Sequence, residues 1–413
     1  MSFDFKKFTK RFTEYEEYAV VAVLGVIAYF IIMAIFTGQR IGTSNAYNSY
    51  SLQADCWRQG RLDLGQNYSY LEIAEYGGKY YISFPPFPSF VAFPFTFIFH
   101  ANTPDHVFCL IACIALVLYL YKIGLHFKLT PQDACLSALF VMLGTNAVFN
   151  NFNPSVWFWA QTLCFLMSTM SIYYALKGKG GISLFCWAAA VGCRPMQVVY
   201  VPVLLVILYY IEYRKNPDKK PFKIITSRLT WAIPPCILAG LYMLLNYLRF
   251  DNHLEFGHNY LPEHLKSEHG QFSFYYMAAN FKSLFHMPEF SSDHKMKIDC
   301  YGNLNFMIVS PYVLFAIVML IVLLIKKQKK QSLLSILVIT LSTAYMAITL
   351  MHKTMGGWSF GNRYANDILP WLYIIGVLGI SKCSKASKYQ IPLFLFGMCL
   401  NVVGTIYVYN NWA

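Results

Sequence analysis

The chain has 413 residues, of which 57% are hydrophobic and only 13% are charged. Soluble domains carry about 25% charged residues and cannot bury this much apolar surface in one core, so a soluble globular protein is excluded. The formal net charge of +13 lies in short basic runs between apolar blocks. This distribution indicates membrane topology rather than a nucleic-acid site.

Apolar blocks close to the roughly 20 residues that cross a bilayer recur along the chain. The first, 18–37, lacks a small-residue cleavage site, so we expect it to stay as a signal anchor. The apolar stretch 84–100 contains four prolines. Because proline removes a backbone donor, this stretch fits a re-entrant or interfacial segment as well as a span. The predicted spans are 18–37, 104–121, 132–148, 155–176, 181–194, 196–212, 229–248, 304–325, 332–351, 367–381 and 390–410.

The basic residues select one topology. With a cytoplasmic N-terminus (Lys6, Lys7, Lys10 and Arg11) and without a full crossing at 84–100, 21 of the 33 Lys and Arg residues lie inside, as the positive-inside rule requires. We therefore expect an all-α polytopic transmembrane bundle of about 11 spans, a single integral membrane domain over 1–413. Its outer segments are 38–103, 249–303 and 352–366. The short inner connections carry no nucleotide-binding motif, which disfavours an ATP-driven pump.

The first outer loop, 38–103, is rich in acidic side chains. Tyr47 to Trp57 places apolar residues at helical spacing and predicts a helix on the membrane surface that ends at Gly60. Carboxylates in and beyond this helix either act on a substrate or solvate the loop, and both interpretations stay open. The acids are Asp55, Asp63, Glu72 and Glu75.

Several segments in this order resemble one family. SLQADCWRQGRLDL (51–64) and GGKYYISFPPFPSFVAFPF (77–95) resemble the first periplasmic loop of the GT-C superfamily glycosyltransferases. That superfamily includes the protein mannosyltransferases and the aminoarabinose transferases of lipid A, and this chain looks most like the bacterial group similar to the dolichyl-phosphate-mannose-type enzymes. Further matching segments are GTNAVFNNFNPSVWFWAQ (144–161), VGCRP (191–195), LRFDNHLEFGHNYL (248–261) and GWSFGNRYANDILP (357–370).

The resemblance implies a GT-C-like glycosyltransferase in the bacterial inner membrane. It would move a sugar from a polyprenyl-phosphate-linked donor to a glycan, lipid or protein acceptor on the outer face, by inverting displacement and without a cofactor. Such a reaction needs a carboxylate to accept the proton of the attacking hydroxyl. It also needs cationic groups at the phosphate that leaves.

The chain departs from the family at the acid. The family carries an acidic pair upstream of the glycine matched by Gly60, whereas this chain has Asn45, Ala46 and Tyr47 there. We therefore assign the base to Asp55, with Asp63 and Glu72 as alternatives.

Arginine is the preferred partner of phosphate because its planar fork binds two oxygens. Arg363 lies in a glycine-rich outer segment, and Arg194 lies at the boundary of a short apolar block, so we expect both to bind the donor phosphate, with Lys353 as a weaker candidate. The alternatives are an ion pair between Arg363 and Asp367, and a snorkelling Arg194.

The second outer loop, 249–303, holds alternating Glu and His residues. Their spacing fits no common metal signature such as HExxH, so we expect no metal, although a divalent ion stays an alternative. We expect Glu255, His258 and Tyr260 to contact substrate, together with Lys79 and Tyr80 of the first loop.

Two further questions stay open from the sequence. Cys56 and Cys300 lie in the two large outer loops and either pair or stay free. The chain would alternatively be a transporter or flippase for lipid-linked saccharides, or a non-catalytic assembly partner, but charged residues are nearly absent from the span centres and no polar path is evident.

Overall fold

The computed structural model describes residues 13–411, which form a bundle of helices with one small hairpin. The predicted basic residues Lys6, Lys7, Lys10 and Arg11 lie outside this range. The α-helices are α2 Glu14–Thr37, α3 Ser49–Arg58, α4 Phe87–Phe99, α5 Asp105–His126, α6 Pro131–Leu143, α7 Ala147–Phe152, α8 Val156–Leu176, α9 Gly180–Val191, α10 Val201–Lys215, α11 Pro221–Thr226, α12 Ile233–Phe250, α13 Pro262–Leu265, α14 Met277–Leu284, α15 Phe306–Val309, α16 Tyr312–Ile325, α17 Lys329–Leu350, α18 Leu369–Lys382 and α19 Gln390–Asn410. The 3₁₀ helices are η1 Pro195–Tyr200, η2 Leu229–Ala232, η3 His258–Tyr260, η4 Phe274–Tyr276, η5 Arg363–Ile368 and η6 Ser384–Tyr389, and the antiparallel strands are β1 Ile73–Tyr76 and β2 Lys79–Ile82.

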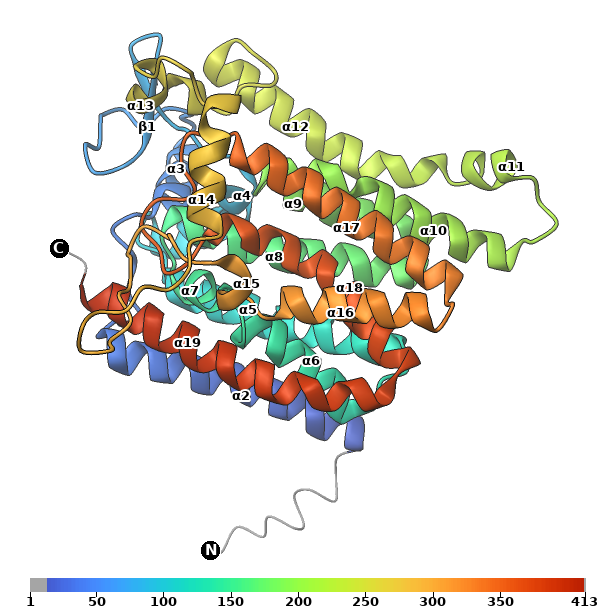
Figure 1. Cartoon of the computed structure of the whole chain (residues 1–413). Helices are drawn as coiled ribbons and strands as arrows, with labels where there is room; N and C mark the ends of the chain where they lie inside the picture. The colour runs from blue at the N-terminus through green and yellow to red at the C-terminus, as the bar shows by residue number, and fades with distance from the viewer. Residues whose placement is uncertain (1–12, 412–413) are drawn as a thin grey trace, which may run out of the picture.

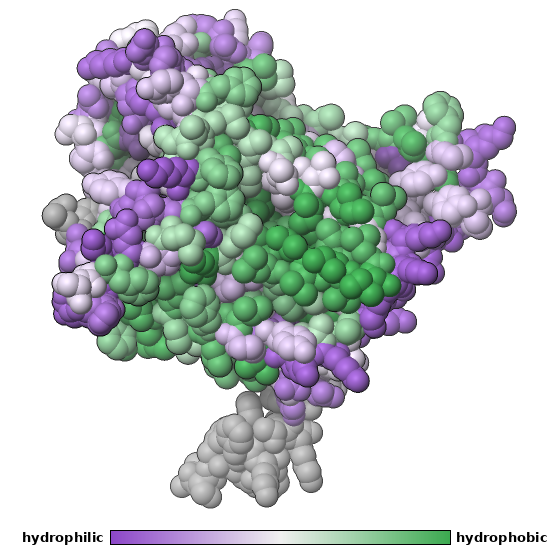
Figure 2. Space-filling model, in the orientation of Figure 1, coloured by the Kyte–Doolittle hydropathy of each residue, from purple (hydrophilic) through white to green (hydrophobic). Residues whose placement is uncertain are grey.

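The long helices run side by side, and the predicted outer segments gather at one end of them (Figure 1). Helices α3, α13 and α14 and the hairpin lie at this end, which we call the loop end, while α11 lies at the opposite end. Helix α18 is central, because every side chain from Leu369 to Ile380 is buried. Apolar residues cover the surface between two more polar ends (Figure 2), as expected for a protein whose middle faces lipid.

Each predicted apolar block falls on a helix, but the predicted number of spans is not settled. Seven of the described helices are long and apolar enough to cross a membrane. Four apolar helices are shorter, with 10–17 residues. One of these is α4, whose 13 residues include Pro94 and correspond to the proline-rich 84–100. Another is α6, which is short because the predicted block 132–148 is interrupted at Gly144 and forms two helices, α6 and α7.

The expectation of an all-α chain missed the β1–β2 hairpin of the first outer loop. Gly77 and Gly78 form its turn with φ of 57° and 72°, which is left-handed backbone that glycine adopts without strain. The hairpin packs on the end of α12: the rings of Tyr81 and Phe250 lie 5.3 Å apart and those of Tyr76 and Tyr260 lie 4.9 Å apart. These aromatic pairs join the two large outer loops.

The sequence left open a disulfide between Cys56 and Cys300, and the structure excludes it. Both thiols are free, and Cys56 is buried in α3. The helix predicted from Tyr47 to Trp57 is present as α3, but seven of its ten residues are buried, so it packs into the protein instead of lying on the surface.

Candidate functional site

A cavity of about 590 Å³ lies at the loop end of the bundle. Its floor comes from helix ends, and its roof comes from the outer loops. Its charged and histidine side chains are Glu72, Arg194, Glu255, His258, Glu263, His264, His352 and Arg363. Aromatic and apolar residues complete it, among them Tyr47, Tyr50, Phe84, Trp157, Phe158, Met196, Phe272, Tyr345, Trp358 and Tyr364.

Arg363 is a buried cation without a carboxylate partner among the described residues. Only 6% of the residue is exposed, and its Nη1 atom has no hydrogen-bond partner. Its Nε donates to the carbonyl of Gly356, where φ of 113° requires glycine and a Cβ would lie 2.7 Å from the arginine side chain. The glycine-rich segment therefore lets the backbone approach the guanidinium closely.

Arg194 is paired, and its partner is Asp367. Arg194 Nε lies 2.9 Å from Asp367 Oδ2. Asp367 therefore does not pair with Arg363, which was the alternative left open from the sequence. It pairs with Arg194 instead. Tyr345 Oη also donates to Asp367 Oδ2 at 2.5 Å, and Gln161 Nε2 donates to Oδ1 at 3.0 Å. Three donors thus fix one buried carboxylate.

The ring of Tyr364 lies beside both arginines. Its centroid is 4.7 Å from the Arg194 guanidinium carbon and 5.1 Å from that of Arg363. Phe158 faces Arg363 at 5.0 Å. Aromatic faces attract guanidinium groups, so these rings hold the two cations at the cavity floor.

Acidic side chains come from the roof. Glu72 is partly buried, and burial raises its pKa. A hydrogen bond with Trp157 lowers this pKa, whereas the negative charge of nearby Glu263 raises it further. Glu255 accepts hydrogen bonds from the Gly257 amide and Asn259 Nδ2, each at 2.6 Å. The raised pKa of Glu72 is what is expected of a carboxylate that takes a proton.

Three histidines form a row between the roof and the floor. The ring centroids of His258 and His264 lie 6.0 Å apart, those of His264 and His352 lie 5.9 Å apart, and His352 meets Tyr364 at 5.8 Å. Burial lowers the pKa of His258 and His352 to about 4, so both rings are neutral near pH 7. Between residues 13 and 411, no three His, Cys, Asp or Glu side chains are grouped to hold a metal ion.

The structure brings five of the predicted site residues to the cavity wall: Glu72, Arg194, Glu255, His258 and Arg363.

The other six predicted site residues do not line the cavity. Asp55 binds Arg58 Nε at 2.9 Å and Gln59 Nε2 at 2.8 Å, and Asp63 accepts from the Gly65 amide. Lys353 donates to the carbonyl of Glu263. Lys79 and Tyr80 lie on strand β2, and Tyr260 stacks on Phe250. The predicted base Asp55 is therefore engaged elsewhere.

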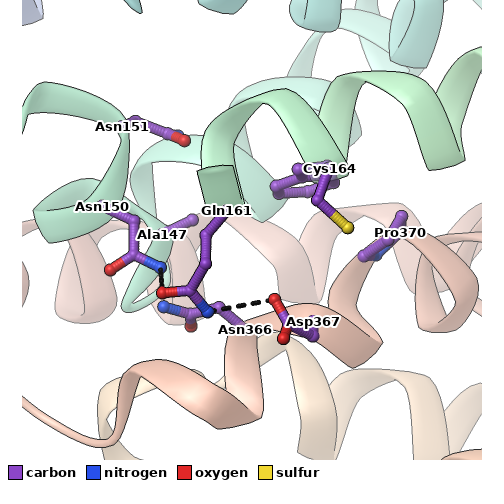
Figure 3. Close-up of a pocket in the computed structure, with 9 residues that line it drawn as sticks. Ala147, Asn150, Asn151, Gln161, Cys164, Asn366, Asp367 and Pro370 are labelled. Carbon is purple, nitrogen blue, oxygen red and sulfur yellow. Dashed lines mark hydrogen bonds between the residues drawn. The ribbon is translucent and has the colours of Figure 1, made fainter. Parts of the chain in front are cut away.

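A small polar pocket of about 10 Å³ lies beside Asp367, between α7, α8 and η5 (Figure 3). There Asn150 Nδ2 donates to Gln161 Oε1 at 3.1 Å, and Gln161 Nε2 reaches both Asp367 and the Arg363 carbonyl, the latter at 3.0 Å. Gln161 thus connects the main chain of one arginine to the carboxylate partner of the other.

Sequence reasoning missed Tyr345, His352, Glu263 and Tyr364 as cavity residues. Of these, only Tyr364 had a usable signal, because it follows Arg363 in the matched segment. Tyr345 lies inside an apolar block and reads as an ordinary core aromatic.

No family model matches the chain, and no curated protein matches it. Solved structures do. The apo oligosaccharyltransferase of Archaeoglobus fulgidus aligns with a TM-score of 0.52 and 12% identity over 96% of this chain and 56% of that one. This likeness shows a GT-C-like fold. Archaeal oligosaccharyltransferase AglB from the same organism, in complex with an inhibitory peptide and a dolichol-phosphate, aligns at 10% identity and TM-score 0.47 over 94% of this chain and 56% of that chain. The chain thus spans little more than half the length of these proteins. Its own seven described helices that are long and apolar enough to cross a bilayer make it a multi-pass membrane protein.

Proposed function

We propose that the chain is a membrane glycosyltransferase that moves a sugar from a polyprenyl-phosphate-linked donor to an acceptor hydroxyl on the outer face. The observation that carries this proposal is Arg363, a buried guanidinium whose Nη1 atom has no hydrogen-bond partner. It lines a cavity that also holds a partly buried carboxylate, Glu72. A buried cation without a counter-charge is costly, and an anionic ligand would supply that charge. The fold supports the same reaction class.

The residues divide the reaction between them. Arg363 binds the phosphate and stabilises the charge that develops on it as the bond from the sugar carbon to the phosphate oxygen breaks. Glu72 accepts the proton of the acceptor hydroxyl as its oxygen attacks that carbon from the opposite side, which inverts the configuration. We therefore move the proposed base from Asp55 and Asp63 to Glu72. Glu255 and His258 remain proposed contacts of the sugar or acceptor, and Arg194, already paired with Asp367, is proposed to border the phosphate without supplying its counter-charge.

Binding of a lipid phosphate tests this function without knowledge of the sugar. Arg363→Gln should weaken the binding of farnesyl phosphate by purified protein about tenfold or more, because hydrogen bonds to charged groups contribute about 1.5–3 kcal/mol. Arg40→Gln, in the first outer loop away from the cavity lining, is the matched control. Equal affinity of Arg363→Gln and the unaltered protein would refute the proposal.

A transporter for lipid-linked saccharides is the competing function. Protein reconstituted in liposomes should release polyprenyl phosphate only when an acceptor is added. Movement of a fluorescent lipid-linked sugar between leaflets, without release of the sugar, would favour transport instead.

A further inference from the structure

The charge at the cavity floor is set by three side chains that come from two separate segments. Arg194 follows α9, and Arg363 and Asp367 lie in η5. Asp367 is 4% exposed and binds Arg194 at 2.9 Å, so this pair has no net charge. Arg363 is left as the floor's one unneutralised cation among the described residues that line the cavity.

We propose that Asp367 makes this floor selective for a donor with a single phosphate over one with a diphosphate. The inference rests on the proposed function, since it presumes that Arg363 holds the lipid phosphate. A phosphodiester that joins a sugar to one lipid phosphate carries a single negative charge, which one guanidinium neutralises. A diphosphate linkage carries one charge more, and Asp367 has already taken the second guanidinium.

The rest of the cavity offers no replacement cation. The histidine row is neutral near pH 7, since burial lowers the pKa of His258 and His352 to about 4. Lys353 points its Nζ to the carbonyl of Glu263 and does not line the cavity. The roof adds only the carboxylates Glu72, Glu255 and Glu263. A second negative charge on the ligand would therefore meet like charges rather than a partner, and it would be disfavoured.

The surroundings of Asp367 hold it in this role. Tyr345 and Gln161 donate to its two oxygens, and Gln197 Nε2 donates to its main-chain carbonyl at 2.9 Å. These donors come from α17, α8 and η1. The carboxylate cannot rotate away from Arg194 without losing several hydrogen bonds, so a ligand phosphate competes for Arg194 against a partner that is already fixed.

The test compares two probes, farnesyl phosphate and farnesyl diphosphate, on the purified full chain. The measured quantity is the ratio of their dissociation constants, which cancels partial loss of folded protein. Asp367→Asn frees Arg194 and should shift the ratio toward the diphosphate by about tenfold, as one added cation near the phosphate predicts. Arg194→Gln should shift it the other way, because Asp367 then stays as an unpaired anion.

The double variant Arg194→Gln with Asp367→Asn removes both charges and should restore the ratio of the unaltered protein. A purely structural role of Asp367 would not give this restoration. Glu212→Gln is the control, because it breaks another arginine–carboxylate pair, the one between Glu212 and Arg228 near α11. It should leave the ratio unchanged. An unchanged ratio in Asp367→Asn overturns the inference while the proposed function stands. If Arg363→Gln binds both probes as tightly as the unaltered protein, the proposed function fails first.

Discussion

At the scale of single residues, Glu72 and Arg363 line one cavity but differ in what burial does to them. Burial favours the neutral form of Glu72, which makes it a better proton acceptor. Arg363 keeps its charge at any physiological pH, so burial leaves it in need of an anion. Asp55, to which we assigned the base from the sequence because the family's acidic position is absent, already accepts hydrogen bonds from Arg58 and Gln59.

The first prediction concerns pH. The base must be ionised to accept a proton, so transfer should fall as pH falls through the pKa of Glu72. Because burial raises this pKa above the usual value for glutamate of about 4.3, the loss should begin at a higher pH than an exposed glutamate would give.

Glu72→Gln should lower the rate at the optimum by about 100-fold or more and abolish this acidic limb, while farnesyl phosphate still binds. The pH–rate profiles of the unaltered protein and of Glu72→Gln measure both effects, with Asp55→Asn as the matched carboxylate control. A full rate in Glu72→Gln, or an acidic limb that persists in it, would contradict the assignment.

At the scale of elements, the helices could be predicted from the sequence, but the residues at which they are interrupted could not. Blocks of apolar residues near span length mark helices whatever their neighbours are. At the break at Gly144 another helix comes close: a Cβ on Gly397 of α19 would lie 2.1 Å from the Gly144 carbonyl oxygen. The hairpin was missed because its four-residue strands are short and lie in a loop already assigned to a surface helix.

That close contact supports a stability prediction. Gly397→Ala would push a methyl group against backbone that cannot move aside, which costs about 1–3 kcal/mol for overpacking. The thermal unfolding midpoint in detergent should fall. Gly240→Ala on α12, where a Cβ meets nothing within 4 Å, should leave the midpoint unchanged or raise it slightly. Equal midpoints for both variants would show that α19 tolerates displacement.

At the scale of the whole molecule, the sequence predicted the architecture better than the site. Composition and charge distribution predict a membrane bundle with its large loops at one end, as Figure 1 displays. The site depends on pairs such as Arg194 with Asp367, separated by 173 residues. No periodicity or local motif specifies which distant side chains meet, so the sequence did not indicate Arg194 as the ion-pair partner of Asp367.

Orientation is a prediction at this scale. If the loop end faces outward, a membrane-impermeant maleimide added to intact cells should label Cys300, in the second outer loop, and not Cys383, between α18 and η6. Both thiols are free and partly exposed, so variants that keep only one of them are informative. Labelling of Cys383 before permeabilisation, with Cys300 protected, would reverse the proposed topology.

The origin of the cavity wall has a consequence for biogenesis. Its residues extend from Tyr47 to Tyr364, and Gln161 finds its partner Asp367 only when η5 arrives. A chain inserted from its N-terminus must therefore hold the face of α8 that carries Gln161 without this partner through most of its synthesis. Nascent chains that end before residue 363 should depend on insertion factors that shield such a face, and release from those factors should coincide with the insertion of α18.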